Sequence, residues 1–199
     1  MKIKIILTDV GGVLVRTESI RARKHWEQKL HMKSGQLTRE ISKIQPAKEA
    51  TVGLVSAEEI WHNVAEKYSI NRADLKQLRI DYFKGEKLNK EFYSFIQKLH
   101  KDFKVVLFTN AWDDGREVYT DKYQLDKICN QMIISAEEGM RKPHKKFYFR
   151  ALELLHVKPQ EVIYIDDRKE NIKAGKEIGF NSILFSHTKD VIDQIKTLI

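Results

Sequence analysis

Short apolar runs alternate with helical patterns over much of the chain. Four runs are continuously apolar and rich in β-branched residues, as buried strands of a parallel sheet are: 104–109, 131–135, 161–166 and 181–185. Between and after these runs, apolar residues recur with the 3.6-residue period of amphipathic helices. With residues 2–8 as a first strand, the pattern predicts an α/β fold, a Rossmann-like five-stranded parallel sheet flanked by helices with right-handed crossovers.

Residues 17–87 follow a different pattern, because no comparable strand occurs there. Apolar residues at helical spacing predict four helices, centred near Trp26, Ile41, Trp61 and Leu78. Ser56 and Glu59 have the spacing of a capping box, and Asn71 is placed to cap the following helix. We therefore predict an α/β core of residues 1–16 and 88–199, and an all-helical cap of residues 17–87, with hinges near 15–17 and 84–88.

Composition narrows the functional classes. The single cysteine, Cys129, excludes an intrachain disulfide and fits a reducing, cytoplasmic location. No apolar run approaches the roughly 20 residues of a membrane span, and Asp9 interrupts the first run before the core of a signal peptide could form. The net charge is +8, but the lysines are scattered and no nucleic-acid-binding motif accompanies them. We expect small phosphorylated ligands as partners rather than membranes or nucleic acids.

Polar residues follow the predicted strands where the strands end. Because the carboxyl ends of parallel strands share one edge of the sheet, where ligands bind in open α/β folds, we expect these residues to converge. They are Asp9 after the first strand, Thr109 and Asn110 after the second, Lys142 in "EEGMRKP" after the third, and Asp166 and Asp167 after the fourth.

Three carboxylates this close would raise one another's pKa values unless a cation lay among them. Oxygen ligands without histidine or cysteine favour Mg²⁺. A nucleophilic carboxylate, a lysine and hydroxyl or amide donors around Mg²⁺ suit phosphoryl transfer. Each residue also has a structural interpretation: Asp9 as a turn cap, Asp166 and Asp167 as helix-initiating acids, and Lys142 as a solvated lysine. Their combined occurrence at successive strand ends favours the functional interpretation.

Four sequence motifs strengthen this interpretation. They are "LTDVGGVL", "LFTNA", "GMRKP" and "VIYIDDRKENIKAGKEIGF", in that order along the chain. The set resembles the haloacid dehalogenase (HAD) superfamily, and within it the phosphatase-like members whose helical cap follows the first motif. The resemblance implies that Asp9 attacks phosphorus and that Thr109 and the Asn110 backbone bind the phosphate. It further implies that Lys142 neutralises charge, and that Asp9, Gly11 through its carbonyl, Asp166 and Asp167 form the Mg²⁺ site.

Gly11 departs from the family pattern. Phosphatases of this kind usually read D-x-D, and the second acid protonates the leaving oxygen and later activates water. General acid–base catalysis of this type is typically worth about 10²–10⁴-fold in rate. The sequence resembles a branch with D-x-G-G-V in the first motif, which includes sugar-phosphate phosphatases. We therefore predict a Mg²⁺-dependent phosphatase that acts through an aspartyl-phosphate on activated leaving groups, or that borrows an acid from the cap, Asp113 or Asp114.

Three alternatives remain open at this point. A dehalogenase also uses an aspartate nucleophile without the second acid, but it needs no Mg²⁺ and tends to carry an aromatic residue at position 11. A phosphoacceptor signalling domain places its acid pair first along the chain, whereas here the pair comes last and a large insertion is present. A binding protein that keeps the fold and the metal site but has lost turnover through Gly11 is the third.

Overall fold

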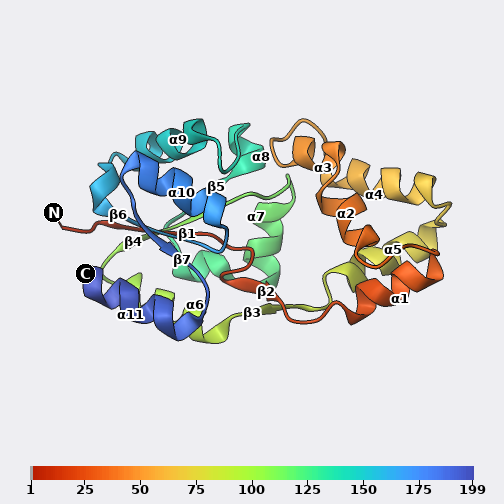
Figure 1. The fold of residues 1–199 in the computed structure, drawn as a ribbon, viewed down its shortest axis with the longest axis horizontal. Coiled ribbons are helices and arrows are strands. Elements are labelled where there is room, and N and C mark those ends of the chain that lie inside the picture. The colour runs from red at the N-terminus through yellow and green to blue at the C-terminus, as the bar shows by residue number, and fades with distance from the viewer. Residues whose placement is uncertain (1) are drawn as a thin grey trace.

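A five-stranded parallel sheet forms the centre of the computed structural model, which describes residues 2–199 (Figure 1). The strands in spatial order are β5 (Gln131–Ile134), β4 (Lys104–Thr109), β1 (Ile5–Thr8), β6 (Val162–Asp166) and β7 (Asn181–Leu184). Every neighbouring pair is parallel, and the central strand β1 pairs with both β4 and β6. The five predicted strands are confirmed, and their carboxyl ends lie at one edge of the sheet.

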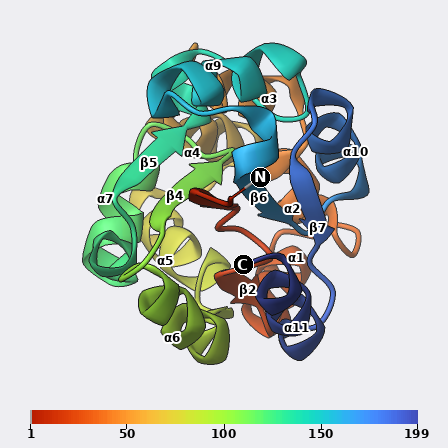
Figure 2. The same ribbon diagram turned by 90° about the vertical axis from the view of Figure 1, so that its left-hand side faces the viewer.

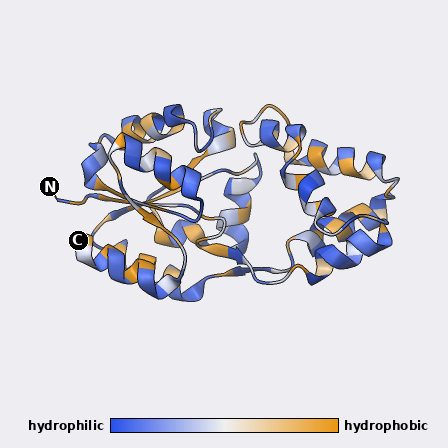
Figure 3. Ribbon diagram, in the orientation of Figure 1, coloured by the Kyte–Doolittle hydropathy of each residue, from blue (hydrophilic) through white to orange (hydrophobic). Residues whose placement is uncertain are grey.

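Helices cover both faces of this sheet (Figures 1 and 2). Helices α6 (Lys90–Leu99) and α11 (Thr188–Leu198) pack on one face, whereas α9 (Lys145–Leu155) and α10 (Lys169–Ile178) pack on the other. Strand residues alternate between the two apolar cores, as Figure 3 reflects in the apolar colour of the strands and of the inner helix faces. The Rossmann-like α/β architecture is therefore confirmed.

Shorter elements connect the strands of the sheet. Strand β4 leads through a loop into α7 (Gly115–Glu117), the π-helical turn η1 (Val118–Lys122) and the 3₁₀ turn η2 (Leu125–Ile128). Helix α8 (Ser135–Glu138) follows β5, and the 3₁₀ turn η3 (Pro159–Glu161) precedes β6. The loop after β4 and the loop after α8 therefore both begin at the carboxyl edge of the sheet.

The inserted segment forms a separate helical layer, at the right of Figure 1. Its helices are α1 (Arg21–Lys29), α2 (Gln36–Ser42), α3 (Gln45–Ala50), α4 (Ala57–Lys67) and α5 (Arg72–Tyr82). They surround an apolar core of their own that includes Trp26, Ile41, Trp61 and Leu78. This separate core supports the predicted division at residues 17–87, which stays a prediction.

The structure corrects the number of helices in this segment. Five helices are present rather than four, because α2 ends at Ser42 and a new helix begins at Gln45 with Pro46 in its first turn. The predicted helix starts are confirmed: Ser56 and Glu59 form a reciprocal capping box, and the Asn71 side chain accepts from the backbone N–H of Asp74.

The two predicted hinges pair with each other. Strand β2 (Val15–Thr17) and strand β3 (Glu86–Leu88) form a two-stranded antiparallel sheet between the α/β layers and the helical layer. The apolar pattern gives no sign of these strands, because each has only three residues and most of those residues are partly or fully exposed. Both chain connections to the cap therefore run side by side.

Candidate functional site

Asp9 lies directly after the central strand and is 6% exposed. The backbone N–H of Val10 donates to its Oδ1 at 2.7 Å, and Lys142 Nζ lies 3.0 Å from its Oδ2. Burial raises the pKa of the Asp9 carboxyl to about 7, although Lys142 opposes the shift. The carboxyl group is therefore held in one orientation, and its charge depends on nearby positive groups.

Lys142 occupies the centre of the site. Its ammonium group contacts three oxygens, at 2.8 Å to the Phe108 carbonyl, 2.6 Å to Asp166 Oδ2 and 3.0 Å to Asp9 Oδ2. A lysine ammonium has three N–H donors, so each donor has a partner. The side chain is 1% exposed. Lys142 is thus a fixed, buried positive charge rather than the solvated lysine of the alternative interpretation.

Asp166 is fully buried and receives hydrogen bonds on both carboxylate oxygens. Oδ2 accepts from Lys142 and from the Tyr164 hydroxyl, each at 2.6 Å. Oδ1 accepts from the Arg168 backbone N–H and from the Asn171 side chain, each at 2.9 Å. Burial alone would raise the pKa of Asp166, but the charge and hydrogen bond of Lys142 hold it below its ordinary value. This carboxylate is consequently ionised and immobile.

Asp167 differs from its neighbour because it is exposed. One carboxylate oxygen of Asp9, one of Asp166 and one of Asp167 lie within 4.8 Å of one another. Partial desolvation of its carboxyl group and the charge of Asp166 raise the pKa of Asp167. Hard carboxylate oxygens gathered in this way fit a small divalent cation such as Mg²⁺. The sequence-predicted acids therefore converge as expected.

The two glycines of the first motif have different surroundings. Gly12 has φ of 77°, and a Cβ atom there would lie only 2.1 Å from Asp167 Oδ2, so a side chain at this position would collide with the acid pair. Gly11 is exposed, and a Cβ atom built on it has no neighbour within 4 Å. The fold thus needs glycine at position 12, whereas position 11 has room for the missing acid.

Thr109 and Asn110 end strand β4 beside Lys142. Thr109 is 1% exposed and lies against the Tyr119 hydroxyl. The Asn110 side chain donates to the Lys142 carbonyl at 3.0 Å and accepts from the Lys142 backbone N–H at 2.9 Å. The amide side chain of Asn110 therefore fixes the loop that carries the lysine, a role that the sequence did not indicate.

Asp113 and Asp114 have separate roles, although the sequence gives them as equivalent. Asp113 Oδ1 accepts from the backbone N–H of Ala57 at 2.9 Å, at the first turn of α4 in the cap. Trp112, one residue earlier, packs against the apolar core of the cap. Asp114 instead lines the cavity between the two layers, where burial and the charge of Asp113 raise its pKa. Asp113 is thus a docking contact, and Asp114 is the acid that faces the cavity.

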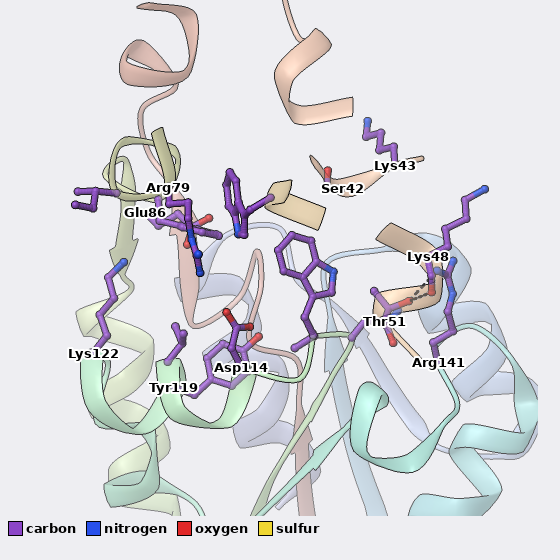
Figure 4. A pocket seen from close by; sticks show the side chains of 18 of the residues that line it. Ser42, Lys43, Lys48, Thr51, Arg79, Glu86, Asp114, Tyr119, Lys122 and Arg141 are labelled. Carbon is purple, nitrogen blue, oxygen red and sulfur yellow. Dashed lines mark hydrogen bonds between the residues drawn. The ribbon is translucent and has the colours of Figure 1, made fainter. Parts of the chain in front are cut away.

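A cavity of about 1040 Å³ lies between the cap and the α/β layers (Figure 4). Asn110 and Ala111 line it from the carboxyl edge of the sheet, and residues of α2, α3, α4 and α5 line it from the cap. Aromatic side chains contribute apolar surface: Trp61, Phe83, Trp112 and Tyr119. A molecule held at the carboxyl edge would extend into this space.

Two residues that fix Asp166 were missed by sequence reasoning. Tyr164 precedes the acid by two positions, so strand alternation places both side chains on the same face of the sheet. Asn171 is 2% exposed on α10, among the buried residues Ile172, Ala174 and Gly175. An asparagine within an apolar helix face is the signal that was available.

Among residues 2–199, no helix has both the length and the apolar character needed to cross a membrane.

Comparisons with known proteins agree with this geometry. Residues 3–179 match the family model described as haloacid dehalogenase-like hydrolase. The chain is 25% identical over 191 residues to D-ribitol-5-phosphate phosphatase of Bacteroides thetaiotaomicron, with 90% of each protein covered. It is 24% identical over 191 residues to pyrophosphatase PpaX of Bacillus mycoides, with 94% of this chain and 86% of that protein covered. The match to drimenol cyclase drtB of Aspergillus calidoustus, 24% identical, covers 74% of this chain but only 28% of that protein.

Solved structures share the fold. A HAD family enzyme of Bacteroides thetaiotaomicron, determined with magnesium and inorganic phosphate, superposes with a TM-score of 0.78 at 19% identity. The superposition covers 92% of this chain and 94% of that one. This similarity extends over both the α/β layers and the inserted helices.

Proposed function

We propose that this chain, which belongs to the haloacid dehalogenase-like hydrolase family, is a Mg²⁺-dependent phosphatase of small phosphorylated metabolites. The hydrolase family and the phosphatase relatives support the reaction class. The observation that carries the proposal is the buried contact of Lys142 with both Asp9 and Asp166, beside Asp167. A sugar phosphate as substrate and a cytoplasmic location belong to the same proposal.

In this proposal, the metal site is formed by Asp9, Asp166, Asp167 and the Gly11 carbonyl, as the sequence predicts. Both oxygens of Asp166 accept hydrogen bonds within the protein. These bonds support a role in orienting Lys142 and in supplying a negative charge to the site. Asp167 is exposed and beside Gly12, so its oxygens face the open side. When bound, Mg²⁺ supplies charge neutralisation for the phosphoryl oxygens.

Asp9 acts as the nucleophile. Its carboxylate attacks phosphorus and forms an aspartyl-phosphate, the leaving oxygen departs with a proton, and water then hydrolyses the acyl phosphate. Lys142 holds one oxygen of Asp9 and neutralises the transferred group, while Thr109 and the backbone of Asn110 bind its oxygens. The rigid hydrogen bonds of Lys142 support this electrostatic role, because preorganised charges stabilise a transition state without further reorganisation.

The leaving-group proton is the step for which this chain lacks the usual acid. Asp114 is the carboxyl that fits the role, because it lines the cavity and burial raises its pKa, which favours a protonated acid. Asp113 is unsuitable, since its carboxylate already accepts from the cap. Without Asp114, the enzyme would depend on leaving groups that need little protonation, such as anomeric sugar phosphates or acyl phosphates.

A panel of phosphorylated metabolites with Mg²⁺ tests the proposal. We expect phosphate release from at least one sugar phosphate, loss of that release in Asp9→Asn, and full activity in the control Asp102→Asn, an exposed acid outside the site. Metal-independent hydrolysis of haloacids without release of phosphate would favour a dehalogenase-like hydrolase. No release that depends on Asp9 from any compound would favour a binding protein without turnover.

Gly11→Asp tests the missing acid separately. Position 11 has space for the side chain, so we expect a folded protein. In an Asp114→Asn background, which lacks the proposed donor, the added acid should raise turnover of alkyl phosphates by about 10²-fold or more. Turnover of acyl phosphates should change little. Equal turnover of alkyl phosphates before and after the substitution would contradict this account.

A further inference from the structure

The cavity under the cap contains more positive charge than its ion pairs neutralise. Arg79 pairs with Glu58, and Arg168 pairs with Glu170. Within residues 2–199, the other basic residues that line the cavity have no carboxylate in ion-pair distance: Lys43, Lys48, Lys122 and Arg141. One of its two acidic residues, Glu86, is already paired with Arg23. The cavity is therefore suited to a ligand with negative charge beyond the phosphate at Asp9.

Arg141 is the best placed of these basic residues. It directly precedes Lys142, yet its side chain lies on the cavity side of the loop, next to Thr51 of the cap (Figure 4). Its Nη1 donates to Thr51 Oγ1 at 3.0 Å, and the guanidinium group is partly buried. A guanidinium has five N–H donors in a planar arrangement that matches a carboxylate or phosphate. Most of these donors remain available to a ligand.

Lys48 and Lys43 lie near Arg141 at the same end of the cavity, whereas Asp114 and Tyr119 lie toward the other end (Figure 4). Both lysines are exposed, so water reaches this end of the cavity. Arg141 and the two lysines together give this end of the cavity a positive charge, which an anion bound there would neutralise. The aromatic side chains that line the cavity would contact the body of the ligand.

We propose that Arg141, assisted by Lys48, binds a second anionic group at the far end of the substrate. The substrate is then a phosphate monoester whose other end carries a carboxylate or a second phosphate. This inference rests on the proposed phosphatase function and names its substrate class. The anion would lie between the cap and the third motif, so its binding would also hold the cap closed.

Five-carbon substrates that differ only at the far end provide the test. Ribitol 5-phosphate has a hydroxymethyl group there, 5-phosphoribonate has a carboxylate, and ribitol 1,5-bisphosphate has a second phosphate. We expect kcat/KM for at least one of the two substrates with an anionic far end to exceed that for ribitol 5-phosphate by about 10- to 100-fold, the usual value of charge-assisted hydrogen bonds. The preferred member of the pair identifies the anion as carboxylate or phosphate.

Two variants separate anion binding from a purely structural contact between cap and loop. Arg141→Gln removes the charge but keeps a donor for Thr51. Thr51→Val removes this hydrogen bond, and the one from Thr51 Oγ1 to the Lys48 carbonyl, but keeps the charge. We expect Arg141→Gln to remove most of the preference for the second anion. Thr51→Val should change the reaction of all three substrates alike and leave their ratio intact. Lys101→Gln, which removes an exposed charge outside the cavity, controls for net charge.

Two results would overturn the inference: the same preference in Arg141→Gln as in the wild type, or no preference in the wild type. Calorimetric binding of the three compounds to Asp9→Asn makes the test independent of turnover. If the wild type releases no phosphate but Asp9→Asn binds the compounds with an anionic far end more tightly through Arg141, the proposed function fails and this inference stands. Phosphate release without that selectivity would support the proposed function and overturn this inference.

Discussion

The carboxyl edge of the sheet and the cavity under the cap organise charge in opposite ways. At the edge, Lys142, Asp9 and Asp166 are buried and bonded to one another. In the cavity, most basic side chains have no acidic partner among the described residues, and several are exposed. Groups that act on every substrate are best held fixed before binding, whereas groups that recognise one substrate must keep their donors free.

The variant with the largest expected effect removes the buried positive charge at the carboxyl edge. Lys142→Met leaves Asp9 and Asp166 buried without their positive partner, so we expect about 3 kcal/mol less stability to urea and activity reduced to background. The control Lys145→Met removes an exposed lysine paired with Glu177 and should cost less than about 1 kcal/mol. Similar losses in the two variants would show that the charges at the edge are not organised as described.

A second test uses pH and Mg²⁺. Burial raises the pKa of Asp9 to about 7, above the ordinary 3.8. The stability that this group contributes is therefore fully present below about pH 4 and is lost as pH rises through about 7 in the metal-free protein. Mg²⁺ favours the ionised carboxylate, so it should raise Tm more at about pH 8 than at about pH 5. Asp9→Asn should remove this difference, and an equal rise at both pH values in the wild type would contradict the assignment.

The smallest expected effect concerns the connection between the two regions. Asp113→Ala removes an acceptor from the first turn of α4, which should cost about 1 kcal/mol in thermal unfolding. Because this contact docks the cap on the loop after β4, we also expect KM to rise several-fold with kcat nearly unchanged. The exposed control Asp102→Ala should change neither. A fall in kcat with constant KM would instead place Asp113 in the chemical step.

Sequence reasoning predicted the carboxyl edge better than the cavity, for a physical reason. The ends of parallel strands meet at one edge, so Asp9, Thr109 and Asp166 could be brought together from strand order alone. The donors that fix Asp166 depend on how α10 packs against β6, which the apolar pattern does not specify. The short hinge strands lack a pattern long enough to detect.

The cavity could not be predicted, because it forms where four cap helices meet loops of the α/β layers. Arg141 has no pattern of its own and is distinguished only by its contact with Thr51, 90 positions earlier in the chain. The same holds for Asp113 and Asp114, which are adjacent in sequence but face the cap and the cavity respectively. Contacts between distant segments, rather than local periodicity, decide these roles.

Detection of the phosphorylated protein tests the central claim most directly. The protein is mixed with a substrate and Mg²⁺, quenched in acid, digested and analysed by mass spectrometry. The account predicts one phosphoryl group on the peptide that contains Asp9 and none in Asp9→Asn. Phosphate release without this adduct in a quench-flow time course, or a phosphoryl group on another residue, would contradict it.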